Sequence, residues 1–165
     1  MLGIIKNRRS VREFTDDYIQ DNIINKIIEM GVWAPSGLNN QPWKFVIIRD
    51  KKIKEDLSLQ TKYSQIIKGA SVLISVFLDH DHSYDRVKDI QAIGACIQNM
   101  LLAIHSLGLG GVWLGQILKN RTAVEKLLLV PESCELMAVI ALGKPAKTKG
   151  SGVRKGINQV IIGSL

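Results

Sequence analysis

The sequence predicts one layered domain built from both helices and strands, of the α/β or α+β class. Apolar residues recur at helical spacing near 23–32 and 90–107. The segment 72–78 is instead a nearly continuous apolar run rich in β-branched residues, as expected for a strand covered on both faces. Because helices and strands mix along the chain and the first 143 residues contain no linker, a single domain over residues 1–165 is expected.

The individual elements follow from local signals. The first long helix is expected to end near Ala34, because Pro35 restricts the backbone of the residue before it. The next elements are a strand over 43–48, a helix over 51–68, the strand over 72–78 and a polar loop over 79–85. A long helix over 90–107, capped by Gly108, a short strand over 111–114 and a helix over 121–129 that Pro131 ends follow them. The last elements are a strand over 136–142, a basic glycine-rich loop over 144–156 and an apolar segment over 157–162.

Composition narrows the range of partners. The chain has 22 Lys and Arg against 15 Asp and Glu, so its net charge of +7 favours an anionic ligand, without choosing among phosphate, nucleic acid and membrane surface. Aromatic residues are only 5% of the chain, too few for a base-stacking surface. Cys96 and Cys134 match no metal or redox spacing. With no signal peptide and no apolar run of about 18 residues, we expect a soluble cytoplasmic protein without a membrane partner.

Two basic segments are candidate phosphate ligands. Arg8-Arg9-Ser10-x-Arg12 offers three guanidiniums and a hydroxyl, and arginine binds phosphate through paired hydrogen bonds. The alternative is a solvated charge cluster. A second basic element could close around the same phosphate, although such runs are usually solvated. Its members are Lys144, Lys147, Lys149, Arg154 and Lys155.

A polar loop bracketed by prolines follows the first helix. It reads Ala34-Pro35-Ser36-Gly37-Leu38-Asn39-Asn40-Gln41-Pro42-Trp43. The prolines restrict its backbone, and its Ser, Asn and Gln side chains supply donors and acceptors. Such a loop suits the polar edge of a planar heterocycle. The alternative is a helix stop followed by an asparagine-rich turn.

Other motifs are weak or absent. The glycines over 108–115 are not a dinucleotide fingerprint, because Trp113 replaces the third glycine and the order is helix to strand. They are interpreted as a helix cap and as places where a ligand can approach the backbone. His80-x-His82 could ligate a metal, but the pair lies in a flexible-looking loop, so no metal site is predicted. His105 is interpreted as a structural residue of the long helix. Without a hydrolytic motif, a bound cofactor is expected to carry any chemistry.

Taken together, these features resemble the nitroreductase family of FMN-dependent oxidoreductases. The resemblance rests on Arg8-Arg9-Ser10-Val11-Arg12-Glu13-Phe14, on residues 34–43, on the long helix leading into Leu107-Gly108-Leu109-Gly110-Gly111-Val112-Trp113-Leu114-Gly115, and on Ala141-Leu142-Gly143-Lys144-Pro145 before the basic tail. It implies an α+β fold with a mainly antiparallel sheet flanked by helices. It also implies a homodimer with FMN at the interface, in which residues 144–165 contact the partner subunit.

The resemblance also implies roles for particular residues. Arg8 and Ser10 would bind FMN at its phosphate and ribityl end, and Arg12 would lie near the pyrimidine ring. Arg9 would also bind the cofactor, and Arg154, or Lys155, would complete the phosphate site. From the other subunit, the residues lining the flavin ring would be Pro35, Ser36, Gly37, Asn39 and Gln41. Backbone atoms of Leu114 and Gly115 would lie near flavin N5. No side chain is assigned as an acid or base, because the flavin carries the chemistry.

The implied activity is ping-pong hydride transfer from NADH or NADPH, through flavin N5, to a small electron-poor acceptor such as a nitroaromatic or a quinone. The chain lacks the insertion that covers the substrate in longer members, so a more open pocket is expected. The alternatives are a non-catalytic module that binds or stores FMN, a specialised flavin reaction such as reductive dehalogenation or flavin fragmentation, and a small basic nucleic-acid binder.

Overall fold

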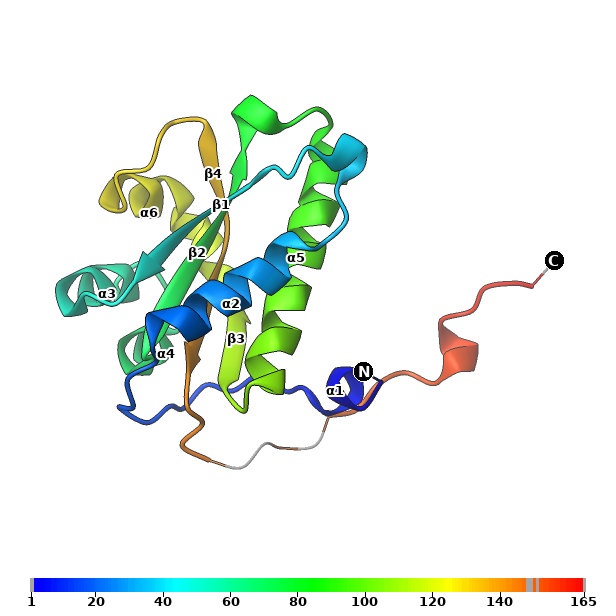
Figure 1. Cartoon of the computed structure of the whole chain (residues 1–165), viewed down its shortest axis with the longest axis horizontal. Coiled ribbons are helices and arrows are strands. Elements are labelled where there is room, and N and C mark those ends of the chain that lie inside the picture. The colour runs from blue at the N-terminus through cyan, green and yellow to red at the C-terminus, as the bar shows by residue number, and fades with distance from the viewer. Residues whose placement is uncertain (1, 148–149, 151, 165) are drawn as a thin grey trace.

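A four-stranded antiparallel sheet forms the centre of the fold in the computed structural model, which describes residues 2–147, 150 and 152–164 (Figure 1). The strand order is β1-β2-β4-β3. The strands are β1 (Trp43–Ile48), β2 (Val72–Asp79), β3 (Gly110–Leu114) and β4 (Cys134–Gly143). Both central strands, β2 and β4, are almost entirely buried, in accord with the apolar runs in the sequence.

Helices cover both faces of the sheet. On one face lie α2 (Asp21–Val32) and the long α5 (Arg86–Ser106), packed on Val72, Ile74 and Val76. On the other lie α3 (Lys51–Ser58), α4 (Ser64–Gly69) and α6 (Arg121–Leu127), packed on Leu73 and Phe77. Successive side chains of a strand point to opposite faces, so β2 contributes to both hydrophobic cores.

One predicted element is wrong in its extent. The helix predicted over 51–68 is two helices, α3 and α4, separated by a turn. The turn is fixed from elsewhere in the chain, because Gln116 Oε1 accepts hydrogen bonds from Thr61 Oγ1 at 2.6 Å and from the Lys62 amide at 3.0 Å. A contact with a residue this distant in sequence leaves no local signal. The short helix α1 (Leu2–Asn7) was not predicted either.

The end of α5 follows the prediction. Gly108 has a φ of 75°, the left-handed conformation that favours glycine, and the amides of Gly108 and Leu109 donate to His105 and Ile104. This closes the helix and directs the chain into β3. The interpretation of Gly108 as a helix cap is therefore confirmed.

The C-terminal segment departs from the body of the fold. Figure 1 shows residues 152–164 running away from the sheet as an arm, with one short turn at Ile157–Gln159. Every described residue of this arm is exposed, including Val153, Ile157 and Ile162. Among the described residues, the apolar segment predicted over 157–162 is therefore exposed and belongs to neither hydrophobic core.

Two further properties of the structure concern membrane spans and cysteines. Among the described residues, none of the helices combines the length and the apolar character needed to cross a membrane. Cys96 and Cys134 are free and buried, and burial raises the pKa of the Cys96 thiol to about 12. A cytoplasmic location stays a prediction.

Candidate functional site

The first candidate segment is held along the edge of β3. Ser10 bridges Gly111 in parallel pairing, and the Val11 amide donates to the Gly111 carbonyl at 3.1 Å. Val11 is buried against Gly110, where an added Cβ would lie 2.7 Å from the valine side chain. The neighbours of Val11 in the chain, Ser10 and Arg12, are exposed. The edge of the sheet therefore fixes the backbone from which these polar side chains project.

Most of the predicted phosphate ligands lie together. Arg8, Arg9, Ser10, Arg12, Gly150 and Arg154 line one hollow of about 370 Å³, which we call the arginine hollow. Residues from near the beginning of the chain thus meet a residue of the C-terminal arm. No acidic side chain lines the hollow among the residues that the structure describes.

The remaining basic residues of the tail lie elsewhere or are not described. Lys144 pairs with Asp17 at 3.6 Å, and Lys147 pairs with Glu13 at 2.6 Å, so both charges are compensated within the chain. Lys149 lies outside the described residues. Lys155 is exposed and does not line the arginine hollow. Of the basic tail, Arg154 is the member that the structure places in the hollow.

The electrostatics of the arginine hollow favour an anion. Burial, together with the positive charges of Arg154 and Arg9, lowers the pKa of Arg8, which means that the guanidinium is crowded by like charge. Arg9 donates to the carbonyls of Lys6 and Arg8, but its Nε is buried without a partner in the described structure. A phosphate supplies both the negative charge and the acceptor oxygens that these groups lack.

A glycine of the arm lies close to two of these guanidiniums. An added Cβ at Gly152 would lie 2.8 Å from Arg9 Nε and 3.4 Å from an Arg154 nitrogen. Only a residue without a side chain lets the arm approach both guanidiniums this closely. Gly150 and Gly152 were not singled out from the sequence, and the glycine-rich character of the tail was the signal available.

The second candidate segment lies far from the arginine hollow in the same protomer. The loop containing Ser36, Gly37, Asn39 and Gln41 contacts the first turn of α5, whereas Ser10 is paired just beyond the last turn of that helix. A 21-residue helix is about 30 Å long. Figure 1 shows the short turn at Gly37–Asn39 beside the opposite end of α5 from the arm. One chain therefore does not bring the two candidate segments together.

The third candidate position lies at the end of β3. Leu114 is buried and Gly115 is exposed, with no atom within 4 Å of the place where a Cβ would be. The Leu114 side chain thus belongs to the core, and only its backbone is available to a ligand. The open space at Gly115 agrees with the expectation that a ligand can approach the backbone there.

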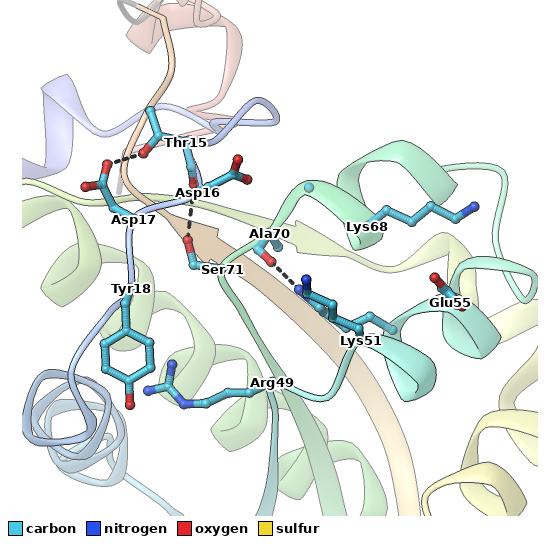
Figure 2. Close-up of a pocket in the computed structure, with 12 residues that line it drawn as sticks. Thr15, Asp16, Asp17, Tyr18, Arg49, Lys51, Glu55, Lys68, Ala70 and Ser71 are labelled. Atoms are coloured by element: carbon cyan, nitrogen blue, oxygen red, sulfur yellow. Dashed lines mark hydrogen bonds between the residues drawn. The ribbon is translucent and has the colours of Figure 1, made fainter.

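A larger hollow of about 620 Å³ lies on another part of the molecule (Figure 2). Its cations include Arg49, which binds Asp21 at 2.7 Å and lies 4.7 Å from the Tyr18 ring centre, and Lys54, which donates to the Ala70 carbonyl. Three carboxylates also line it, those of Asp16, Asp17 and Glu55. This mixture of signs makes it a weaker anion site than the arginine hollow, although it has the greater volume.

The two histidines that could have ligated a metal are paired with separate carboxylates. His80 lies 2.9 Å from Glu135, and His82 lies 2.8 Å from Asp79. Within the described part of the chain, no three His, Cys, Asp or Glu side chains come together as metal ligands would. The geometry therefore gives each of these histidines a hydrogen bond to a carboxylate at the surface.

Comparison with known proteins gives one consistent result. Residues 5–60 and 54–144 match the Nitroreductase family. A protein of Archaeoglobus fulgidus, described as "Putative NADH dehydrogenase/NAD(P)H nitroreductase", is 36% identical over 151 residues, which cover 90% of this chain and 87% of the relative.

Solved structures agree with the sequence match. A nitroreductase-like protein of Desulfovibrio desulfuricans, crystallised in complex with FMN, is 43% identical, with a TM-score of 0.95 over 99% of this chain and 96% of the other. The NADPH:FMN oxidoreductase of Vibrio harveyi, complexed with NAD+, shares the fold with a TM-score of 0.92 at 24% identity, over 99% of this chain and 76% of that one. The predicted α+β fold with an antiparallel sheet is confirmed.

Proposed function

The chain belongs to the nitroreductase family of NAD(P)H-dependent oxidoreductases, and we propose that it binds FMN between two copies of itself and reduces a small electron-poor acceptor. The arginine hollow is the observation that carries this proposal. Several guanidiniums and a hydroxyl converge there without a compensating carboxylate among the described residues. This donor set fits the phosphate of FMN, and the relative from Desulfovibrio desulfuricans was crystallised with FMN.

The proposal requires a second copy of the chain. FMN is far shorter than α5, so one FMN molecule cannot contact the arginine hollow and the Ser36–Gln41 loop of the same protomer. A two-fold related copy can bring its own loop to the hollow of the first. We therefore propose a single domain over residues 1–165 that functions as a homodimer, with one FMN shared at each of two equivalent sites.

The exposed arm supports the same arrangement. Several of its apolar side chains are open to solvent, at 91% for Val153 and 66% for Ile157, and burying them against a partner would be favourable. We propose that residues 144–165 contact the partner subunit. The arm also carries Arg154, so its position and the phosphate site are coupled.

Each group in the chain has a distinct task in this proposal. Arg8, Ser10 and Arg154 bind the phosphate, with Arg9 beside them. Arg12 places a fixed positive charge near the pyrimidine ring, where it stabilises negative charge. The open position of Gly115 and the backbone of Leu114 leave room for a nicotinamide or an acceptor at the ring. When bound, FMN supplies hydride transfer in two half-reactions, from NADH or NADPH and then to a nitroaromatic, a quinone or a similar acceptor.

Anaerobic mixing of the FMN-loaded protein with NADH and, separately, with NADPH tests the proposal. We expect the visible absorbance of the flavin to bleach with at least one of them, because the oxidised flavin accepts electrons. The absorbance should return when a quinone or nitroaromatic is added. Bleaching by neither nicotinamide would favour a storage module. Failure to bind FMN at all would overturn the proposal.

A further inference from the structure

The Ser36–Gln41 loop adopts a conformation that its own residues do not favour. Leu38, Asn39 and Gln41 have φ values of 54°, 55° and 48°. The left-handed region costs a residue with a side chain about 1 kcal/mol, less for asparagine. The Leu38 side chain is 86% exposed, so burial does not offset this cost. Hydrogen bonds within the loop, such as the one from the Gln41 amide to Ser36 Oγ at 3.0 Å, offset part of this cost, and contacts from outside the loop add to them.

The main external contact comes from Asp89, in the first turn of α5. This residue is fully buried, and its carboxylate accepts four hydrogen bonds. Asn40 Nδ2 donates to Oδ1 at 2.8 Å. The donors to Oδ2, at 2.6 to 3.0 Å, are Ser83 Oγ and the amides of Tyr84 and Asp85. Burial alone would raise the pKa of Asp89, but these hydrogen bonds outweigh it and lower the pKa, so the carboxylate is charged.

Asn40 is the link between this carboxylate and the loop. The same Nδ2 group also donates to the His82 carbonyl at 2.9 Å. The side-chain amide of Asn40 therefore binds both the start of α5, at Asp89, and the turn that precedes this helix, at His82. A charged acceptor makes the Asp89 contact stronger than a bond between neutral groups.

A second contact restrains the loop on the same side. The place where a Cβ would stand on Gly37 is 1.9 Å from the Tyr84 hydroxyl oxygen, so the loop backbone lies directly against this ring. The Tyr84 amide is itself bound to Asp89 at 2.9 Å. Asp89 therefore organises both restraints on the loop, the one through Asn40 and the one through Tyr84.

We propose that Asp89 is a positioning residue which, through Asn40, fixes the Ser36–Gln41 loop in the shape that receives the flavin ring of the partner subunit. This inference rests on the proposed function, because that proposal brings Ser36, Gly37, Asn39 and Gln41 to the ring. Asp89 itself touches no cofactor. A loop already ordered before FMN arrives loses less conformational entropy on binding, which increases affinity.

Two variants and a matched control test the inference. Asp89→Asn keeps the shape of the side chain but directs an amide at groups that are themselves donors. Asn40→Ala removes the link and leaves the other three bonds of Asp89, so it remains informative if Asp89→Asn fails to fold. The control is Asn120→Ala, because Asn120 Nδ2 also joins two segments, by donating to the Gln60 carbonyl at 3.0 Å, and neither residue contacts the loop through this bond.

Two measurements are made on each protein, together with its thermal midpoint. In Asn40→Ala, we expect the FMN dissociation constant to rise about tenfold, as for loss of one bond to a charged group. In the FMN-free protein, amide hydrogen exchange should become faster within residues 36–41 and stay unchanged in the sheet. In Asn120→Ala, FMN affinity and loop exchange should match those of the wild type, even if the midpoint falls.

The outcomes separate the inference from the proposed function. A wild-type protein that binds no FMN overturns the proposed function and the inference with it. If the wild type binds FMN and Asn40→Ala binds it equally well, with unchanged loop exchange, the inference alone is overturned. Equal losses of affinity in Asn40→Ala and Asn120→Ala would also overturn it, because the effect would then follow from general destabilisation.

Discussion

Two groups of arginines in this fold show opposite uses of the same side chain. Arg86 and Arg121 converge on Glu135 of β4, which is only 11% exposed, and an Arg86 nitrogen lies 3.0 Å from the carboxylate. The pKa of Arg86 is raised by this carboxylate, and that of Glu135 is lowered chiefly by Arg86. In the arginine hollow, by contrast, the pKa of Arg8 is lowered by burial and by neighbouring arginines.

The difference between the groups is the carboxylate. Where Glu135 is present, the charges are compensated within the chain and connect β4 to α5 and α6, so they support the fold. Where no carboxylate lines the hollow in the described structure, positive charge accumulates and is available to an anion. Whether a group of arginines can bind an anion therefore depends more on the presence of a nearby carboxylate than on the number of arginines. Variants of the two groups should differ accordingly.

The largest expected effect is on FMN affinity. Replacing both Arg8 and Arg154 with alanine should raise the FMN dissociation constant at least about 100-fold, because each loses a charge-assisted bond of roughly 1.5–3 kcal/mol. Fluorescence titration measures this change. The matched double variant, Arg86→Ala with Arg121→Ala, should change the constant less than about twofold. Similar losses in both would contradict the contrast.

The next effect is on stability. Glu135→Gln should lower the free energy of unfolding by about 1–3 kcal/mol at pH 7, measured by urea denaturation, and leave FMN affinity unchanged. Because the pKa of Glu135 is lowered in the folded protein, its contribution is present above the unfolded pKa of about 4.3 and is lost as the pH falls through the folded value. The gap between wild type and variant should therefore shrink below about pH 4. A gap that widens there would be inconsistent with this origin.

A smaller effect should distinguish the role of Arg12 from that of Arg8 within the arginine hollow. Arg12→Ala should slow reduction of bound flavin by NAD(P)H about tenfold, because a positive charge near the developing negative charge is lost. Its effect on FMN affinity should be smaller than that of Arg8→Ala. Stopped-flow absorbance under saturating FMN gives the rate. If both single variants weaken binding equally and neither slows reduction, Arg12 has no separate role.

The smallest effect concerns the shape of the hollow. Gly152→Ala should weaken FMN binding about twofold, because the new methyl group displaces the Arg9 guanidinium, whose flexible side chain absorbs most of the strain. Gly156→Ala is the control, since nothing lies within 4 Å of its added Cβ. Titration of both variants side by side is sufficient. Identical affinities in the two would mean that the arm does not depend on close approach at Gly152.

The sequence predicted the buried parts of the fold better than the connections. The apolar run of β2 and the helical stripe of α5 are long local patterns, and the structure contains both elements. The break between α3 and α4 depends instead on Gln116, which lies more than 50 residues away from the turn that it fixes. Local periodicity carries no information about such a contact.

The candidate site shows the same limit. The segment from Arg8 to Arg12 was recognisable as a phosphate ligand by residue type, but spacing alone left a solvated cluster as an alternative. Its meeting with Arg154 is a property of the folded chain. The buried Asp89 had no distinctive signal, because an aspartate in the first turn of a helix is common and its partner Asn40 lies in a separate loop. The binding roles of these residues stay predictions until FMN titrations are done.

The arginine hollow brings together residues that lie almost 150 positions apart in the sequence. Arg8 is synthesised early and Arg154 almost 150 residues later, so the hollow cannot assemble before Arg154 has been added to the chain. A polypeptide that stops before Arg154, or loses that residue to a protease, keeps all four strands and lacks one wall of the hollow. Retention of an anionic ligand would therefore distinguish molecules that contain Arg154 from those that lack it.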